Sequence, residues 1–239
     1  KTPIEDIAGV YTKKSVFMQT ECSETSDSRF LYPVSLKPAY IENLDELPFP
    51  SRKHMSHVNF FSIVGVSKKF TTIISSRGCP FHCIMCDVPY KKYRARSIKN
   101  IADEIEDCVN QGFDEFHFYD DMFNITPERI IEFSNELISR KLKITWDFRG
   151  RVNTVTYESL KTAKKSGLRM ISFGVETGTN EGLKFIKKET TVEKIKEVFK
   201  ICNDLKIKTI ADYMIGFPFE KTRKDIEENI KFCYGLNPT

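Results

Sequence analysis

A regular alternation of short apolar runs and helical patterns constrains the fold of this chain more than any other feature of its sequence. Residues that favour helix N-caps precede amphipathic helical patterns at intervals of about 30 residues. The helix starts that this pattern predicts are Ser97, Thr126, Thr156, Thr191 and Thr222. Runs rich in β-branched and aromatic residues precede these helices and predict strands at 70–75, 115–119, 144–148, 170–175 and 209–215.

Five consecutive strand-then-helix units predict an α/β fold in which helices cover a parallel sheet. With this many units in a row, we expect a partial (β/α) TIM-like barrel of parallel strands rather than a doubly wound sheet. Cys108, Cys202 and Cys233 lie on the apolar faces of the predicted helices. We therefore expect these three cysteines to be small residues of the core.

Residues 1–66 lack this alternation and predict an N-terminal connector with extended and β structure. Two short strands are predicted within Ile7–Met18, and a proline-punctuated stretch follows at 38–50. Proline restricts its own backbone and that of the preceding residue, so we interpret this stretch as a stiff joint to a domain upstream of Lys1. Residues 67–239 are then the barrel core.

Composition excludes several classes of protein. The 239 residues are 40% hydrophobic and 29% charged, which is typical of a globular chain. No apolar run approaches the ~20 residues of a membrane span, and no secretory signal is visible, so we expect a soluble, cytoplasmic protein. The net charge of +4 is spread over interleaved basic and acidic residues, which argues against a dedicated nucleic-acid surface.

Cys79, Cys83 and Cys86 form a C-x₃-C-x₂-C motif in one loop after the first predicted strand. An odd total of 7 cysteines fits a disulfide framework poorly and favours a metal site in a reducing compartment. Three thiolates at this spacing can bind one iron–sulfur cluster, and a four-iron cluster would then keep one open coordination position, as a catalytic metal requires.

Two alternatives to an open cluster follow from the same residues. His82 as a fourth ligand would give a closed zinc site in a non-catalytic metal-binding module, although no second Cys/His pair follows at zinc-finger spacing. A fourth cysteine would give an electron-transfer centre, but the next one, Cys108, lies on a predicted core face.

Polar residues also follow the other predicted strands where each of them ends. Reactive groups gather at the carboxyl ends of the strands in a βα barrel. Asp121, Arg151 and Glu176 are examples of such residues. Carboxylates suit an ammonium group or ribose hydroxyls, and arginines suit a carboxylate. A structural ion pair between these carboxylates and arginines is the alternative interpretation.

The cysteine motif and its place after the first barrel strand resemble the radical S-adenosylmethionine (SAM) superfamily. The resemblance implies an enzyme in which Cys79, Cys83 and Cys86 hold a [4Fe-4S] cluster that binds SAM. It further implies reductive cleavage of SAM to a 5′-deoxyadenosyl radical. The partners implied are a small-molecule or natural-product substrate and a reductant such as flavodoxin or ferredoxin.

A narrower resemblance links the chain to the subgroup that has an N-terminal cobalamin-binding domain. The segments that carry it are 43–50, 76–81, 118–123 and 174–178. It implies that a domain outside this chain holds cobalamin, and the expected reaction is cobalamin-dependent methyl transfer to a carbon centre. A radical cyclase, rearrangement or methylthiolation enzyme is the alternative within the family.

The resemblance also implies a set of SAM contacts. The residues at the matching positions are Met85, Asp120, Asp121, Arg151, Glu176, Lys188, Asp212 and Gly216. Asp120 and Asp121 take the place that faces the SAM amino group, and Lys188 takes the place that faces its carboxylate. Glu176 and Asp212 take places at the ribose hydroxyls. We expect Glu176 and Lys188 to bind SAM rather than each other.

Overall fold

The computed structural model describes residues 40–55, 57–60, 62–88 and 90–238. The strands predicted within Ile7–Met18 lie outside these residues. A compact unit extends from Asn43 to Thr239 and contains the sheet and its helices. Among the described helices, none combines the length and the hydropathy that crossing a bilayer requires.

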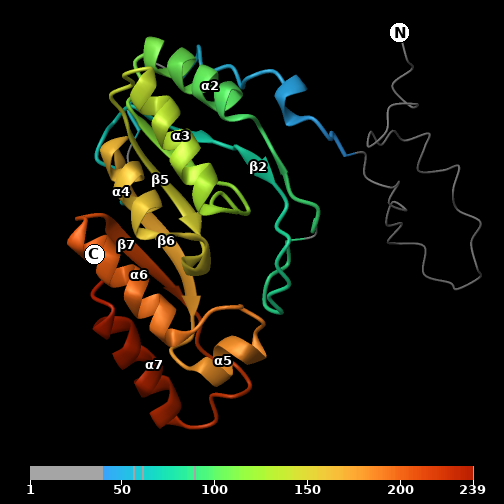
Figure 1. The fold of residues 1–239 in the computed structure, drawn as a ribbon, viewed down its shortest axis with the longest axis vertical. Coiled ribbons are helices and arrows are strands. Elements are labelled where there is room, and N and C mark those ends of the chain that lie inside the picture. The colour runs from blue at the N-terminus through green and yellow to red at the C-terminus, as the bar shows by residue number, and fades with distance from the viewer. Residues whose placement is uncertain (1–39, 56, 61, 89, 239) are drawn as a thin grey trace, which may run out of the picture. The chain divides into compact units, whose positions relative to one another are not determined.

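Five parallel strands form the main sheet and lie in the order in which they occur along the chain. They are β1 (Phe70–Ile73), β4 (Glu115–Phe118), β5 (Thr145–Gly150), β6 (Leu168–Glu176) and β7 (Lys208–Tyr213). The helices that follow them are α2 (Ile98–Asn110), α3 (Pro127–Ser139), α4 (Tyr157–Lys165), α6 (Val192–Asp204) and α7 (Arg223–Gly235). These helices succeed one another along one side of the sheet (Figure 1). Because the strand order never reverses, the predicted partial barrel is confirmed.

Each of the five predicted helix starts is an N-cap in the structure. The capping side chain accepts a hydrogen bond from the backbone N–H three residues further on, which satisfies one free donor of the first turn. The caps are Ser97, Thr126, Thr156, Thr191 and Thr222. The sequence pattern does not predict the short helix α5 (Asn180–Phe185) or the 3₁₀ segments η2 (Leu44–Glu46) and η3 (Val152–Thr154).

An aromatic cluster fills the core between the sheet and its helices. Phe118, Phe123 and Trp146 lie with ring centroids 4.8 to 5.9 Å apart, because alternate strand residues face the helices. Cys108 and Cys202 are buried, as predicted. Cys233 is only partly buried, because α7 covers the last strand of the sheet and buries just one of its own residues, Asn229.

The segment 43–55 packs on the barrel. Leu44 is buried, and the Asp45 carboxylate accepts a hydrogen bond of 2.9 Å from the backbone N–H of Ser97. A joint that only linked two domains would not need these contacts. The compact unit therefore begins at Asn43, whereas the sequence pattern places the start of the barrel at residue 67.

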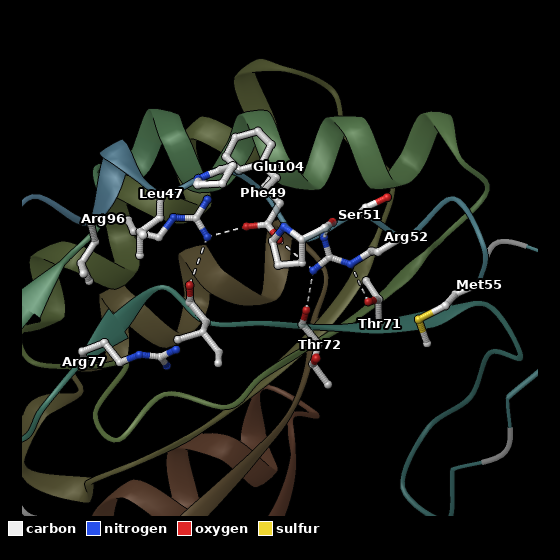
Figure 2. Close-up of a pocket in the computed structure, with 14 residues that line it drawn as sticks. Leu47, Phe49, Ser51, Arg52, Met55, Thr71, Thr72, Arg77, Arg96 and Glu104 are labelled. Carbon is white, nitrogen blue, oxygen red and sulfur yellow. Dashed lines mark hydrogen bonds and ion pairs between the residues drawn. The ribbon is translucent and has the colours of Figure 1, made fainter. Parts of the chain in front are cut away.

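Two arginines bind the free side of the edge strand β1. Arg52 donates through Nη2 to the Thr72 carbonyl at 2.8 Å, and Arg96 donates to the Ile74 carbonyl at 3.0 Å (Figure 2). Both guanidinium groups also pair with the buried carboxylate of Glu104 on α2. The connector, the edge strand and α2 are thereby joined by one buried ion-pair network.

Candidate functional site

The three motif cysteines lie on a hairpin that follows β1 directly. Two short antiparallel strands, β2 (Ser76–Arg77) and β3 (Arg94–Ala95), form its base. The backbone N–H of Cys79 donates to the Tyr90 carbonyl at 3.0 Å and closes the loop above this base. Gly78 has a φ of +80°, and a Cβ there would lie 2.4 Å from the Lys92 carbonyl oxygen. Only glycine therefore allows the two arms of the hairpin to approach so closely.

The three cysteines line a single cavity of about 380 Å³ at the carboxyl edge of the sheet. Six of the eight predicted SAM contacts line the same cavity, and they come from several different strand ends. These six are Met85, Asp121, Arg151, Glu176, Lys188 and Asp212. A second cavity, of about 310 Å³, lies under the connector (Figure 2), and none of its described lining residues is a cysteine.

Arg151 brings a positive charge next to the cysteines. Its Nη1 donates to Cys83 Sγ at 3.1 Å, and its guanidinium lies 3.8 Å from the centroid of the Phe81 ring. Burial raises the pKa of the Cys79 thiol, although a backbone hydrogen bond at Phe81 and the charge of Arg151 lower it in part. A nearby guanidinium favours the thiolate form that binds metals.

Asn124 holds the backbone of Arg151 in place. Its Oδ1 accepts from the Arg151 N–H at 3.2 Å, and its Nδ2 donates to the Arg151 carbonyl at 2.8 Å. Gly150 leaves room for this amide, since a Cβ there would lie 2.1 Å from Asn124 Oδ1. These two residues fix the direction in which Arg151 enters the cavity.

Glu176 and Lys188 form an ion pair inside the cavity, with Nζ 2.8 Å from Oε1. The expectation that they do not bind each other is therefore wrong. Their side chains are only 13% and 8% exposed, and two opposite charges withdrawn from water are most stable when paired. A Cβ at Gly174 would lie 2.5 Å from the Glu176 carboxylate, so glycine makes space for the pair.

Asp121 and Asp212 each have a partner at the cavity wall. Asp121 Oδ2 accepts from the backbone N–H of Gly78 at 2.9 Å, which ties the cysteine hairpin to the end of β4. Asp212 Oδ2 accepts from the Ser172 hydroxyl at 2.5 Å, across the neighbouring strands β6 and β7. Both aspartates thus combine a structural contact with exposure to the cavity.

Asp120 and Gly216 are not among the described residues that line this cavity. The buried carboxylate of Asp120 accepts from Ser75 N at 2.6 Å and from Ser75 Oγ at 2.5 Å. Burial raises the pKa of Asp120, and these hydrogen bonds oppose the rise in part. Gly216 donates its N–H to Glu220 at 2.6 Å. Both groups hold loops in this way, and their expected contacts with SAM stay a prediction.

Several cavity residues were not among the predicted SAM contacts. They are Asp87, Met122, Arg149, Gly150, Ser172, Gly174 and Met214. Ser172 and Gly174 stand four and two positions before Glu176 on β6, so the strand period of two places them on the same face. That alternation was the signal that could have identified them.

A second group of titratable residues lies on the inner face of the sheet, near the start of β4 and β5. His117 Nδ1 lies 2.7 Å from Asp147 Oδ2, and Glu115 is fully buried beside them. Carboxylates and imidazole can bind a metal, but the Arg169 guanidinium lies 3.2 Å from Glu115 Oε1 and 3.3 Å from Asp147 Oδ2. Since Arg169 already pairs with both carboxylates, we interpret the group as a structural network.

Comparison with known proteins gives relatives of several activities. An uncharacterized methyltransferase of Pyrococcus horikoshii is 30% identical over 201 residues, which are 82% of this chain and 43% of the relative. The anaerobic magnesium-protoporphyrin IX monomethyl ester cyclase of Cereibacter sphaeroides is 35% identical over 170 residues, which are 68% of this chain and 28% of the relative. The chain thus spans less than half the length of these proteins.

Solved structures share the fold. The radical SAM methyltransferase TsrM of Kitasatospora setae superposes with a TM-score of 0.66 at 19% identity, over 71% of this chain and 33% of that protein. The sequence profile of the Radical SAM superfamily matches residues 73–233, which include the cysteine hairpin and all five parallel strands apart from the first residues of β1. The chain therefore belongs to the radical SAM superfamily.

Proposed function

We propose that this chain is the catalytic core of a radical SAM enzyme, in which Cys79, Cys83 and Cys86 hold a [4Fe-4S] cluster. The observation that carries the proposal is that all three thiols line one cavity together with groups of both charges. None of the described residues of that cavity supplies a fourth thiol, which fits a cluster with one open iron. When bound, the cluster and SAM supply reductive cleavage and a 5′-deoxyadenosyl radical.

The polar groups of the cavity complement those of SAM. Lys188 and Arg151 offer positive charge to a carboxylate, while Asp121 offers negative charge to an ammonium group. Glu176 and Asp212 offer carboxylate oxygens to ribose hydroxyls. Binding in this way requires Lys188 and Glu176 to exchange their mutual contact for contacts with the ligand.

We further infer that the reaction is cobalamin-dependent methyl transfer to a carbon centre of a small molecule. Two relatives support this inference: the Pyrococcus protein is named a methyltransferase, and TsrM is a methyltransferase whose structure contains cobalamin and a [4Fe-4S] cluster. A radical cyclisation is the second candidate, because the magnesium-protoporphyrin cyclase has the higher identity, 35%.

Anaerobic reconstitution with iron and sulfide tests the proposal. We expect one four-iron cluster per chain, a change in its absorption and electron paramagnetic resonance spectra on addition of SAM, and formation of 5′-deoxyadenosine after reduction. A chain that binds zinc stoichiometrically and no iron–sulfur cluster would refute the proposal and support the closed metal-binding module.

A further inference from the structure

Arg149 and Tyr119 lie next to each other on the inner face of the sheet, which is turned away from the helices. Phe118 and Phe148 belong to the core between the sheet and its helices. Because side chains alternate along a strand, the following residues, Tyr119 and Arg149, face the opposite side. Tyr119 keeps this direction beyond the end of β4, since its backbone N–H donates to the Ile73 carbonyl at 3.1 Å.

The guanidinium group of Arg149 has no acidic partner among the described residues. It lies 4.9 Å from the centroid of the Tyr119 ring, and the described part of the chain gives it neither an ion pair nor a hydrogen bond. Arg151, two positions later, instead donates to Cys83 Sγ and to Asn153 Oδ1. A guanidinium held over an aromatic ring keeps its N–H groups available for a carboxylate or a phosphate.

The pair of Arg149 and Tyr119 stands at the margin of the cysteine cavity. Arg149 lines this cavity, whereas Tyr119, which is 51% exposed, is not among its described lining residues. Tyr119 follows β4, which lies on one side of β5, while Glu176 and Asp212 belong to β6 and β7 on the other side. The Arg149 side chain therefore turns away from the residues proposed for the ribose of SAM.

Methionine side chains supply apolar surface in the same cavity. They come from the cysteine loop, from the segment after β4 and from the segment after β7, and they are Met85, Met122 and Met214. Thioether side chains are flexible and adapt to apolar ligands of different shape. A ligand with its charged end on Arg149 would thus meet apolar surface with the rest of its body, in the cavity that also contains the three thiols.

We propose that Arg149 binds an anionic group of the substrate, a carboxylate or a phosphate, and that Tyr119 positions the guanidinium. The inference rests on the proposed function and deepens it, because it gives the substrate a chemical class: an anionic group joined to an apolar body. SAM carries a carboxylate of its own, but Lys188 and Arg151 are available for it. Arg149 is the specificity-determining residue for the second ligand, which has to lie beside SAM.

Binding of benzoate and of phenyl phosphate to the reconstituted, SAM-loaded protein tests the proposal, with benzyl alcohol as the neutral analogue. Saturation-transfer nuclear magnetic resonance titrations measure the three dissociation constants. We expect at least one of the two anions to bind about tenfold or more tightly than benzyl alcohol, and Arg149→Gln to remove this preference. The ratio of the two anion affinities shows whether the site favours a carboxylate or a phosphate. The matched control Arg223→Gln removes the same charge from an exposed arginine of α7 and should keep the preference.

The positioning role of Tyr119 has its own pair of variants. Tyr119→Leu removes the aromatic face, and we expect it to weaken binding of the preferred anion about two- to fivefold. Tyr119→Phe keeps the ring and should bind the anion as the parent does. Equal losses in Tyr119→Leu and Tyr119→Phe would show that the ring does not position the guanidinium.

Equal affinity of the parent for the anions and for benzyl alcohol, or an unchanged preference in Arg149→Gln, would overturn the anion site. Weaker SAM binding in Arg149→Gln, measured by equilibrium dialysis, would also overturn the proposal, because the arginine would then belong to the SAM site. A parent protein that assembles no cluster would refute the proposed function instead. The same titrations of the cluster-free protein would then decide whether Arg149 binds anions.

Discussion

Asn124 shows how strongly the cavity depends on residues that do not line it. Its side chain is fully buried and bonds both backbone groups of Arg151, which then reaches Cys83. At this scale the sequence predicts residue types better than their contacts. The resemblance assigns both Asp120 and Asp121 to the SAM amino group. Neighbouring side chains at the end of a strand, however, point in different directions. Asp120 faces Ser75 and Asp121 faces the cavity.

At the motif cysteines, we expect Cys83→Ala to abolish cluster assembly, because a cluster with two remaining thiolates is not retained. The matched control is Cys202→Ala. Burial raises the pKa of Cys202 to about 12, so this cysteine stays a thiol in the core and takes no part in metal binding. The iron and sulfide content per chain measures cluster assembly in both variants. Full iron content in Cys83→Ala would show that this residue is not a ligand.

For the ion pair in the cavity, we expect Glu176→Gln and Lys188→Met each to weaken SAM binding by roughly tenfold or more while the iron content stays unchanged. Losing one hydrogen bond to a charged group costs about 1.5–3 kcal/mol. Equilibrium dialysis of SAM with the reconstituted variants measures the effect. The control Glu197→Gln removes the exposed partner of Lys194 on α6 and should leave binding at the parental value. Parental SAM affinity in both cavity variants would contradict the assignment.

At the scale of secondary structure, the segment 43–55 acts as part of the barrel. Arg52 and Arg96 place two guanidinium groups on one buried carboxylate, Glu104, which joins 43–55 to α2 and to the base of the cysteine hairpin. A substitution of Glu104 would therefore break contacts with residues that are distant from it in the sequence. Its effect on stability should exceed that of any exposed carboxylate on the same helix.

We expect Glu104→Gln to lower the free energy of unfolding by about 3–5 kcal/mol, because both arginines would then be buried without a counter-charge. The control Glu106→Gln lies on the same helix, where Glu106 is half exposed and pairs with Arg140, and should cost about 0–1 kcal/mol. Urea unfolding followed by circular dichroism measures both values. Similar losses in the two variants would show that the buried network contributes no more than a surface pair.

The helices and long strands were predictable because each has a local signal. Five N-caps and their apolar faces mark the helices, and β-branched runs mark the parallel strands. The hairpin base and α5 lacked such signals. β2 and β3 contain two residues each and α5 contains six, which is too few to show a period of two or of 3.6. Contacts such as that of Arg52 with Glu104 depend on long-range packing, which local patterns do not encode.

At the scale of the whole molecule, the barrel is one part of a longer architecture in its relatives, of which the chain spans 43% and 28% in the two cases compared. The segment 43–50, which resembles the cobalamin-dependent subgroup, is fixed to α2 by Asp45. This contact holds the first residues of the barrel unit to the start of α2.

We expect a longer protein in which another domain precedes this chain to bind cobalamin and to require it for methyl transfer. Anaerobic purification with added cobalamin, followed by absorption spectra and product analysis, measures binding and turnover. The chain from residue 43 onward serves as the control and should bind SAM but not cobalamin. A longer protein that converts SAM to 5′-deoxyadenosine without binding cobalamin would eliminate the methyltransferase and leave the cyclase or another radical reaction.

The contacts of Arg52 and Arg96 with the edge of the sheet also affect how readily the protein associates with itself. An open sheet presents unpaired carbonyls at its outer strands, and such strands can recruit a strand of another molecule. Arg52 and Arg96 occupy the carbonyls of Thr72 and Ile74 and so block this recruitment. Shortening the chain past Arg52 would expose one of these acceptors, and light scattering should then detect oligomers built by strand addition. We therefore expect the segment 43–55 to limit aggregation of the barrel.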